Sequence, residues 1–210
     1  MHRTMLCRTM LRQTMLLAFS AIALVLSAAY AAAQTAPTPP DTLKVDYFEY
    51  ANTTGAPDST LHLTNPGTTG ATMCAAIYVF DPVEEMTECC SCSLSTNDLR
   101  ILSVNKDLDS NTATGVEITT GTVSIVSTPQ VNGACPTPTS LTPASGGVRA
   151  WMTHMDRLRI GGTTSGFVGS VAPSQDATLS SYEQSQLQFA CDAIVVVASG
   201  AGICTCGTGY

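Results

Sequence analysis

The chain has few charged side chains and almost no lysine. Charged residues make up 12% of its 210 residues, and its only lysines are Lys44 and Lys106. Nucleic acids and anionic lipids are bound by basic surfaces, so neither is an expected partner. Aromatic residues amount to 6%, with a single tryptophan, Trp151. Threonine, serine, glycine and proline take the place of charge, which favours strands and turns over exposed helices.

Long apolar runs are absent except near the N-terminus, where only two serines interrupt residues 15–29. Three arginines precede this run, and Ala31, Ala32 and Ala33 follow it. This order is typical of a secretion signal and predicts cleavage before Gln34. The alternative, a membrane anchor, needs about 20 apolar residues. Position 34 is not cysteine, which argues against lipid attachment, and no later run is long enough to span a membrane.

We therefore expect three segments: a signal peptide (1–33), a Pro/Thr-rich extended leader (34–42) and a single β-rich domain (43–210). Loss of the three N-terminal arginines changes the formal net charge from −7 to about −10, which makes anionic partners less favourable still. The expected location is the outer cell surface or the extracellular medium, with the periplasm as the alternative.

Cysteine is abundant for an exported chain of this size. Removal of Cys7 with the signal leaves an even number, which in an oxidising compartment implies up to four disulfides. Bridges between Cys89 and Cys90, or between Cys204 and Cys206, would close very short loops, so we expect residues 89–92 to pair outward with the remaining cysteines. The eight disulfide cysteines are Cys74, Cys89, Cys90, Cys92, Cys135, Cys191, Cys204 and Cys206.

Short β-branched and aromatic segments between turn residues predict an all-β fold. Residues 115–119 and 122–127, joined by Thr120-Gly121, have the composition of a hairpin. Residues 128–147 and 161–169 are rich in small and turn residues and are expected to be irregular. Together the pattern predicts a disulfide-stapled antiparallel β-sandwich of Ig-like type. The other predicted strands are 43–50, 60–64, 73–80, 100–104 and 148–154.

One C-terminal helix is predicted over 180–192. Ser180 or Ser181 can cap it, and Glu183 lies in the first turn, where the helix dipole favours negative charge. Residues 193–198 fit either a continuation of the helix or a strand, because they are mostly β-branched. The expected buried face consists of Tyr182, Leu187, Phe189, Ala190, Ile194 and Val197.

The chain contains CAAIYVF at 74–80, ECCSC at 88–92 and LSVNKDL at 102–108, followed by Leu179-Ser180, Glu183, Cys191 and the segment from Gly200 through Cys206. These segments resemble a set of cysteine-rich secreted proteins of Acidobacteria that have no established activity. The resemblance covers most of residues 34–210 and implies an exported protein, but it implies no catalytic residue.

Two groups of residues are candidates for ligand sites, and each also has a simpler structural explanation. The cysteines of 89–92 and 204–206 are candidate thiolate metal ligands, with His154 as a further ligand, but they lack the usual zinc spacing. Cys89 and Cys92 have the spacing of a redox pair, but Cys90 lies between them and no βαβ pattern surrounds them, so structural disulfides are preferred. Asp107, Asp109 and Asn111 place oxygen ligands at alternate positions, as calcium loops do. The EF-hand template then requires glycine at 112 and glutamate at 118, and the chain has Thr112 and Ile118. We therefore expect a solvated acidic loop and no cofactor, with calcium as the alternative.

No pattern of catalytic residues is complete. His154 lies near Asp156 in the sequence, but no Gly-x-Ser-x-Gly motif presents a nucleophile. A pair of carboxylates for glycoside hydrolysis could come from a short acidic stretch, although a solvated turn explains it equally well. We expect no catalytic residue and no enzymatic activity. The stretch contains Asp81, Glu84, Glu85 and Glu88.

These observations favour an exported non-catalytic structural or adhesive protein of the cell surface or extracellular matrix, which could assemble with itself into filaments through an exposed strand edge. The alternative is a carbohydrate-binding module, and an unrecognised hydrolase is the third hypothesis. Surface polysaccharide is the expected partner in the second case. The aromatic side chains of the protein that are candidates for stacking on sugar rings are Trp151, Tyr47, Tyr50 and Tyr78.

Overall fold

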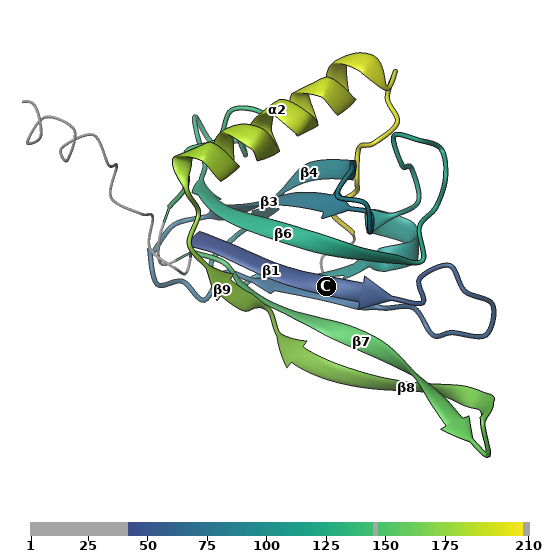
Figure 1. Ribbon diagram of the computed structural model, residues 1–210. Helices are drawn as coiled ribbons and strands as arrows, with labels where there is room; N and C mark the ends of the chain where they lie inside the picture. The colour runs from purple at the N-terminus through teal and green to yellow at the C-terminus, as the bar shows by residue number, and fades with distance from the viewer. Residues whose placement is uncertain (1–41, 145–146, 208–210) are drawn as a thin grey trace, which may run out of the picture. The chain divides into compact units, whose positions relative to one another are not determined.

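Nine strands and one α-helix make up most of the regular structure in this computed structural model, which describes residues 42–144 and 147–207 (Figure 1). Sheet A has the order β4-β3-β6-β1-β9, and sheet B the order β5-β2-β7-β8. All strand pairs are antiparallel. The elements are β1 (Leu43–Glu49), β2 (Thr60–Thr64), β3 (Met73–Phe80), β4 (Met86–Leu94), β5 (Leu99–Ser103), the π-helical turn η2 (Val104–Leu108), β6 (Thr120–Pro129), β7 (Arg149–Ile160), β8 (Thr163–Pro173), β9 (Gln175–Ala177) and α2 (Ser181–Val197).

The main hydrophobic core lies between the two sheets. Alternation along β2 directs Leu61 and Leu63 into this core, and Met152 of β7 joins them from the neighbouring strand. Sheet A contributes Ile77 and Ile125 from its paired central strands β3 and β6. The expected β-sandwich with one C-terminal helix is confirmed.

A second core lies on the other face of sheet A, beneath α2. Tyr78 of β3 is fully buried there, and its hydroxyl donates to the carbonyl of Pro138 at 2.8 Å. Leu187 and Cys191 of α2 pack into the same cluster. Strand β3 is therefore buried on both faces, as its unbroken apolar sequence predicts. The molecule has three layers, and α2 covers one outer face (Figure 1).

Two predictions of irregular or hairpin structure are wrong. Residues 115–119 are not a strand, and β6 continues through Gly121 between β1 and β3. This glycine is needed for close packing, because a Cβ atom there would lie 2.4 Å from the carbonyl oxygen of Phe80. Most of the segment 161–169 belongs to β8, since the turn is confined to Gly161 and Gly162. Strand β4 was not predicted, because its cysteines hide the alternation.

Helix α2 extends through Val197, so residues 193–197 are helical. Ser180 caps it by accepting from the backbone N–H of Glu183 at 3.0 Å. The predicted burial of Leu187 and Ile194 is confirmed, and Cys191 is buried with them, but several other side chains of the predicted face are exposed. The Cys89–Cys191 disulfide requires position 191 to face sheet A, which fixes which side of the helix is buried. The exposed side chains include Tyr182, Phe189 and Val197.

The predicted signal peptide (1–33) and residues 34–41 of the predicted leader lie outside the described residues. Thr42, the last residue of that leader, is buried at the start of β1. Among the residues that the structure describes, no helix has both the length and the apolar character required to cross a membrane.

Candidate functional site

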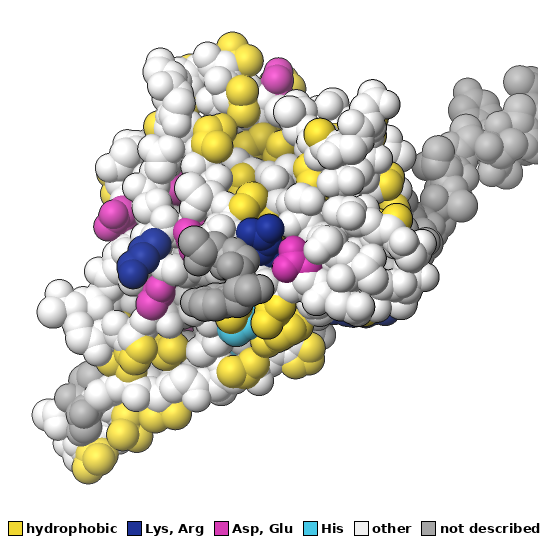
Figure 2. All heavy atoms as spheres, turned by 180° about the vertical axis from the view of Figure 1, so that it is seen from behind, with side chains coloured by type: hydrophobic (Ala, Val, Ile, Leu, Met, Phe, Trp, Pro, Cys, Tyr) yellow, Lys and Arg dark blue, Asp and Glu magenta, His cyan; other side chains and the backbone are white. Residues whose placement is uncertain are grey.

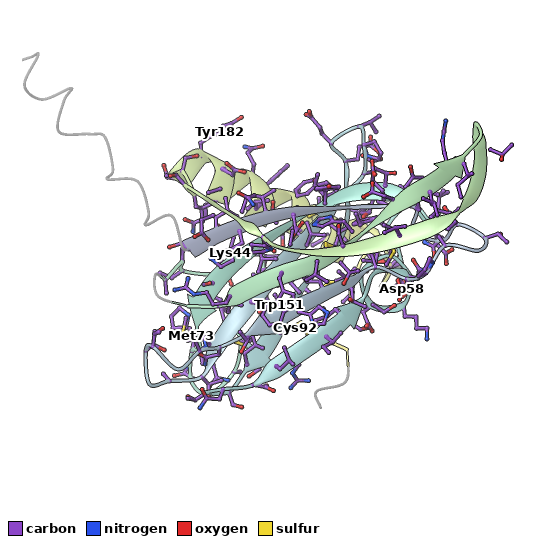
Figure 3. The ribbon with its side chains drawn as sticks, turned by 90° about the horizontal axis from the view of Figure 1, so that it is seen from below. Lys44, Asp58, Met73, Cys92, Trp151 and Tyr182 are labelled. Atoms are coloured by element: carbon purple, nitrogen blue, oxygen red, sulfur yellow. A yellow bond between two sulfur atoms is a disulfide. The ribbon has the colours of Figure 1, made fainter. Side chains whose placement is uncertain are left out.

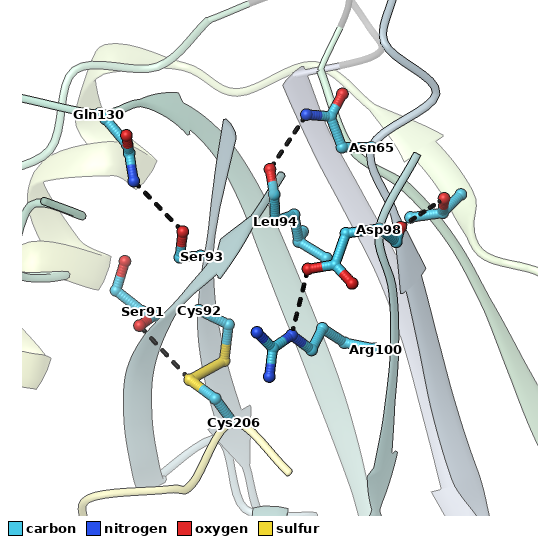
Figure 4. A network of polar contacts seen from close by, with 10 residues as sticks. Asn65, Ser91, Cys92, Ser93, Leu94, Asp98, Arg100, Gln130 and Cys206 are labelled. Carbon is cyan, nitrogen blue, oxygen red and sulfur yellow. Dashed lines mark hydrogen bonds and ion pairs between the residues drawn. A yellow bond between two sulfur atoms is a disulfide. The ribbon is translucent and has the colours of Figure 1, made fainter. Parts of the chain in front are cut away.

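The disulfides connect β4 to the C-terminal end of the chain. The structure pairs Cys89 with Cys191, Cys90 with Cys204, and Cys92 with Cys206, as Figure 4 shows for the last. Neighbouring strand residues point to opposite faces, so Cys89 faces α2 while Cys90 and Cys92 face the inter-sheet core. None of the three pairs with Cys74 or Cys135, which bond to each other.

The segment after α2, residues 200–207, closes one open side of the sandwich; we call it the C-terminal tail. The backbone N–H of Cys89 donates to the carbonyl of Gly202 at 2.9 Å, and that of Thr205 donates to the carbonyl of Asp107 at 2.8 Å. The tail therefore contacts the edge of sheet A and the η2 turn that follows β5, an edge strand of sheet B. It pairs with part of the otherwise open edge of β4.

The same disulfides bear on whether these cysteines could bind a metal ion or act as a redox pair. The sulfur atoms of Cys90, Cys92 and Cys206 lie within 4.8 Å of one another. Each belongs to a disulfide, and a disulfide sulfur is not the thiolate that zinc binding or a redox nucleophile requires. Cys89 and Cys92 likewise do not form a redox pair with each other, because they are bonded to different cysteines on different faces of the sheet.

The other side of the sandwich is held by a buried polar network around Asp46 of β1. His154 of β7 lies with its Nε2 atom 3.2 Å from one carboxylate oxygen, and the Ser174 hydroxyl donates to the other at 2.6 Å. Asp156, which lies near His154 in the sequence, is exposed. The hydroxyl is bonded to the carboxylate and not to the imidazole, so this arrangement is not a Ser-His-Asp triad.

The acidic residues singled out in the sequence are dispersed. Asp81 caps the β3–β4 turn by accepting from the backbone of Val83 and Glu85, and Glu84 and Glu85 are exposed. Among the described residues, no three carboxylate or histidine side chains converge as a metal cluster. Glu88 differs from these other acidic residues because its side chain is completely buried.

The three calcium candidates make separate contacts. Asp107 accepts from the backbone N–H of Ser103 and from the Thr205 hydroxyl. Asn111 donates from its side chain to the carbonyl of Gly200 at 3.0 Å. Both residues therefore bind the protein's own chain around the C-terminal tail. Asp109 is fully buried and lies apart from these contacts.

Within residues 42–144 and 147–207, no helix covers the outer face of sheet B. Its strand register aligns one residue from each strand in a continuous row, Ile101–His62–Trp151–Pro173, which we call the tryptophan row. The rings of His62 and Trp151 are stacked, with centroids 5.2 Å apart and planes inclined by 15°. Partial burial lowers the pKa of His62, which favours the neutral ring at neutral pH.

A pocket of about 620 Å³ lies beside Trp151 on the β8 side of the tryptophan row. The His62 ring stacks on one face of the indole, and Trp151 is one of the residues that line the pocket. The charged groups around it are Arg149, Lys44 and Asp176, the last two joined by an ion pair of 2.5 Å. An aromatic surface beside hydrogen-bonding groups is typical of sites that bind small polar ligands.

The other aromatic candidates are engaged elsewhere. Tyr78 is buried under α2, which removes it from any surface site. Tyr47 packs on His154 with ring centroids 4.3 Å apart. Tyr50 contacts Phe167 and lies beneath the guanidinium of Arg157 at 4.7 Å. Trp151 is therefore the candidate that borders an open pocket.

The comparisons with known proteins add no functional assignment. No protein-family model, curated protein or solved structure matches the chain.

Proposed function

We propose that this protein is an exported, non-catalytic adhesive domain that binds polysaccharide through the tryptophan row. The observation that carries the proposal is the position of Trp151 at the border between an uncovered sheet face and a pocket with charged walls. Sugar rings stack on aromatic side chains, and sugar hydroxyls accept hydrogen bonds from donors such as the Arg149 guanidinium.

The stapled architecture supports the same proposal. Four disulfides join segments separated by 61 to 114 residues, which limits unfolding outside the cell. A rigid sheet presents side chains with little loss of conformational entropy on binding. The buried Asp46–Ser174 contact lies directly behind the pocket, because Ser174 also lines it.

Binding is tested with the purified protein on an array of bacterial and plant polysaccharides, followed by affinity electrophoresis on each positive polymer. We expect Trp151→Ala to weaken binding by roughly 10- to 100-fold, the equivalent of about 1.5–3 kcal/mol for loss of a stacked aromatic. Trp151→Phe is expected to retain part of the affinity.

The matched control is Tyr182→Ala, since Tyr182 is an exposed aromatic on α2, at the opposite outer face of the molecule (Figure 3). Its binding should equal that of the unmodified protein. Absence of binding across the array, or equal affinity for Trp151→Ala and the control, would contradict the polysaccharide proposal.

A second candidate function, self-assembly, is favoured by the β7–β8 hairpin. Strand β7 pairs with β2 only over Arg149–Met152, so the rest of the hairpin is a two-stranded arm with β8 at its edge. Hydrophobic side chains gather along this arm (Figure 2), including Leu158, Ile160 and Val168. An open edge with apolar side chains can add a strand of a second copy of this chain.

Sedimentation velocity over a range of protein concentrations tests self-assembly. We expect concentration-dependent association that Val168→Lys abolishes, because charge on an edge strand blocks pairing. A surface control is Val196→Lys on α2, another exposed valine. A strictly monomeric protein at the highest concentration would rule this candidate out.

A further inference from the structure

Two buried carboxylates lie at the end of the sandwich next to the C-terminal tail. Glu88 shares its face of β4 with Cys90 and Cys92, so its side chain points into the space between the sheets. Asp109 lies in the loop that follows η2. Both side chains have no exposed surface.

Each carboxylate has one bonded oxygen and one unbonded oxygen. Oε1 of Glu88 accepts from the backbone N–H of Asn111 at 2.8 Å. Oδ2 of Asp109 accepts from the Asn52 side chain at 2.7 Å and from the backbone N–H of Ile118 at 2.9 Å. Oε2 of Glu88 and Oδ1 of Asp109 are buried and have no hydrogen-bond partner among the described residues.

Among the described residues, no positive side chain forms an ion pair with either carboxylate. The three ion pairs of the described residues involve Asp176, Asp98 and Asp46, not Glu88 or Asp109. The negative charge of Glu88 acts on Asp109, and Glu117 adds a further negative charge nearby. Buried negative charges are costly unless a cation or a proton compensates them.

We propose that Glu88 and Asp109 bind a divalent cation, with calcium the ion that best suits a site made of oxygen donors. The unbonded atoms Oε2 and Oδ1 are the two protein ligands. Calcium accepts six to eight oxygen ligands and tolerates irregular geometry, so water can supply the remainder. A pocket of about 350 Å³ lies against the loop that follows Asp109, and its lining residues include Thr112 and Glu117.

A bound cation would fix the loop between Asp109 and Ile118 and, through it, the C-terminal tail. The backbone carbonyl of Asn111 accepts from Gly202, and the backbone N–H of Ala113 donates to the carbonyl of Thr87. The site is separate from the tryptophan row and does not depend on the proposed polysaccharide binding.

The experiment compares thermal unfolding of the full exported protein in EDTA, calcium and magnesium at about pH 8, where both carboxylates are ionised without a cation. We expect saturating calcium to raise the Tm by roughly 5–10 °C. Isothermal titration calorimetry should give one calcium ion per chain.

Glu88→Gln and Asp109→Asn keep the side-chain shapes and should abolish the calcium-dependent Tm shift. The matched control is Asp107→Asn, because Asp107 lies two residues from Asp109 but uses both oxygens in contacts with the chain. It should keep the full calcium shift even if its Tm in EDTA is lower.

Two results would overturn the proposal. One is an unmodified protein with no Tm shift and no binding heat for either cation. The other is a Glu88→Gln protein that retains the shift. If Glu88→Gln also raises the Tm in EDTA while the unmodified protein ignores cations, the two carboxylates share a proton instead. Should both variants fail to fold, the calorimetric stoichiometry of the unmodified protein decides the question.

Discussion

At the scale of single residues, burial has its largest effect on Glu88 and Asp109. Burial raises the pKa of Glu88 to about 7, although the N–H of Asn111 opposes the shift. Burial also raises the pKa of Asp109 to about 7, with the negative charges of Glu88 and Glu117 acting in the same direction. Donation from Ile118 and Asn52 to Asp109 opposes that increase. The folded protein without a cation therefore holds protons that the unfolded chain releases.

This difference predicts a pH dependence for protein kept free of divalent cations. The folded pKa values exceed the unfolded ones, so the stabilisation is complete below about pH 4 and is lost as the pH rises to about 7. The free energy of unfolding should fall by several kcal/mol over this interval, because each unit of pKa shift corresponds to about 1.4 kcal/mol, and urea denaturation in EDTA measures the change.

Glu88→Gln removes one of the two titrating groups and should flatten this part of the profile. Glu85→Gln is the control, because Glu85 is an exposed glutamate on the neighbouring turn. A stability that rises between pH 4 and 7 in the unmodified protein would show that other groups dominate.

Glu88 also shows why the candidate site was hard to find from the sequence. In the sequence, Glu88 follows three other acidic residues and precedes a cysteine cluster, so it resembles a solvated residue of a turn. Once 86–94 is known to be a strand, its spacing of two from Cys90 places it on the inward face. The available signal was the alternation Glu88-x-Cys90-x-Cys92, which becomes informative only with the strand assignment.

At the scale of elements, the junction between α2 and the C-terminal tail depends on Gly202. Its φ of +75° favours glycine, and a Cβ atom there would lie 2.2 Å from Cγ2 of Ile194. Its N–H and carbonyl both bond, to Asn111 and Cys89. No other residue type meets the conformational and the steric condition together.

Gly202→Ala should therefore lower the free energy of unfolding by about 2–4 kcal/mol, through backbone strain and overpacking against α2. The matched control is Gly200→Ala, which also has a positive φ but open space around its Cβ position. Its loss should be limited to about 1 kcal/mol. Equal losses in urea denaturation would mean that the steric contact with Ile194 is unimportant.

At the scale of the whole molecule, the disulfides hold the layers and the tail together. Cys90 and Cys204 are separated by 114 positions in the sequence, so their disulfide closes a longer loop than that of Cys74 and Cys135, which are separated by 61 positions. Both should stabilise the fold, but only the first attaches the C-terminal tail to β4.

The double variant Cys90→Ala with Cys204→Ala should lose about 2–4 kcal/mol in urea denaturation. Hydrogen exchange should also become faster at the amides of Cys89 and Thr205, which the tail contacts protect. The double variant Cys74→Ala with Cys135→Ala is the control: it should lose comparable stability and keep the slow exchange of the tail. Unchanged exchange in the first variant would show that the Cys92–Cys206 bridge and the hydrogen bonds hold the tail without the Cys90–Cys204 bridge.

The sequence by itself determined the strand-rich class, the even cysteine set and the local boundaries of β2, β3 and the Ser180 cap. These follow from residue alternation, β-branched composition and capping chemistry, all of which act between near neighbours in the chain. Only the tertiary structure decided which cysteines pair, which face of α2 is buried, and that Glu88 and Asp109 lie at one end of the core. Those outcomes depend on how strands distant in sequence align, and a register shift of one residue would reverse which side chains face the core.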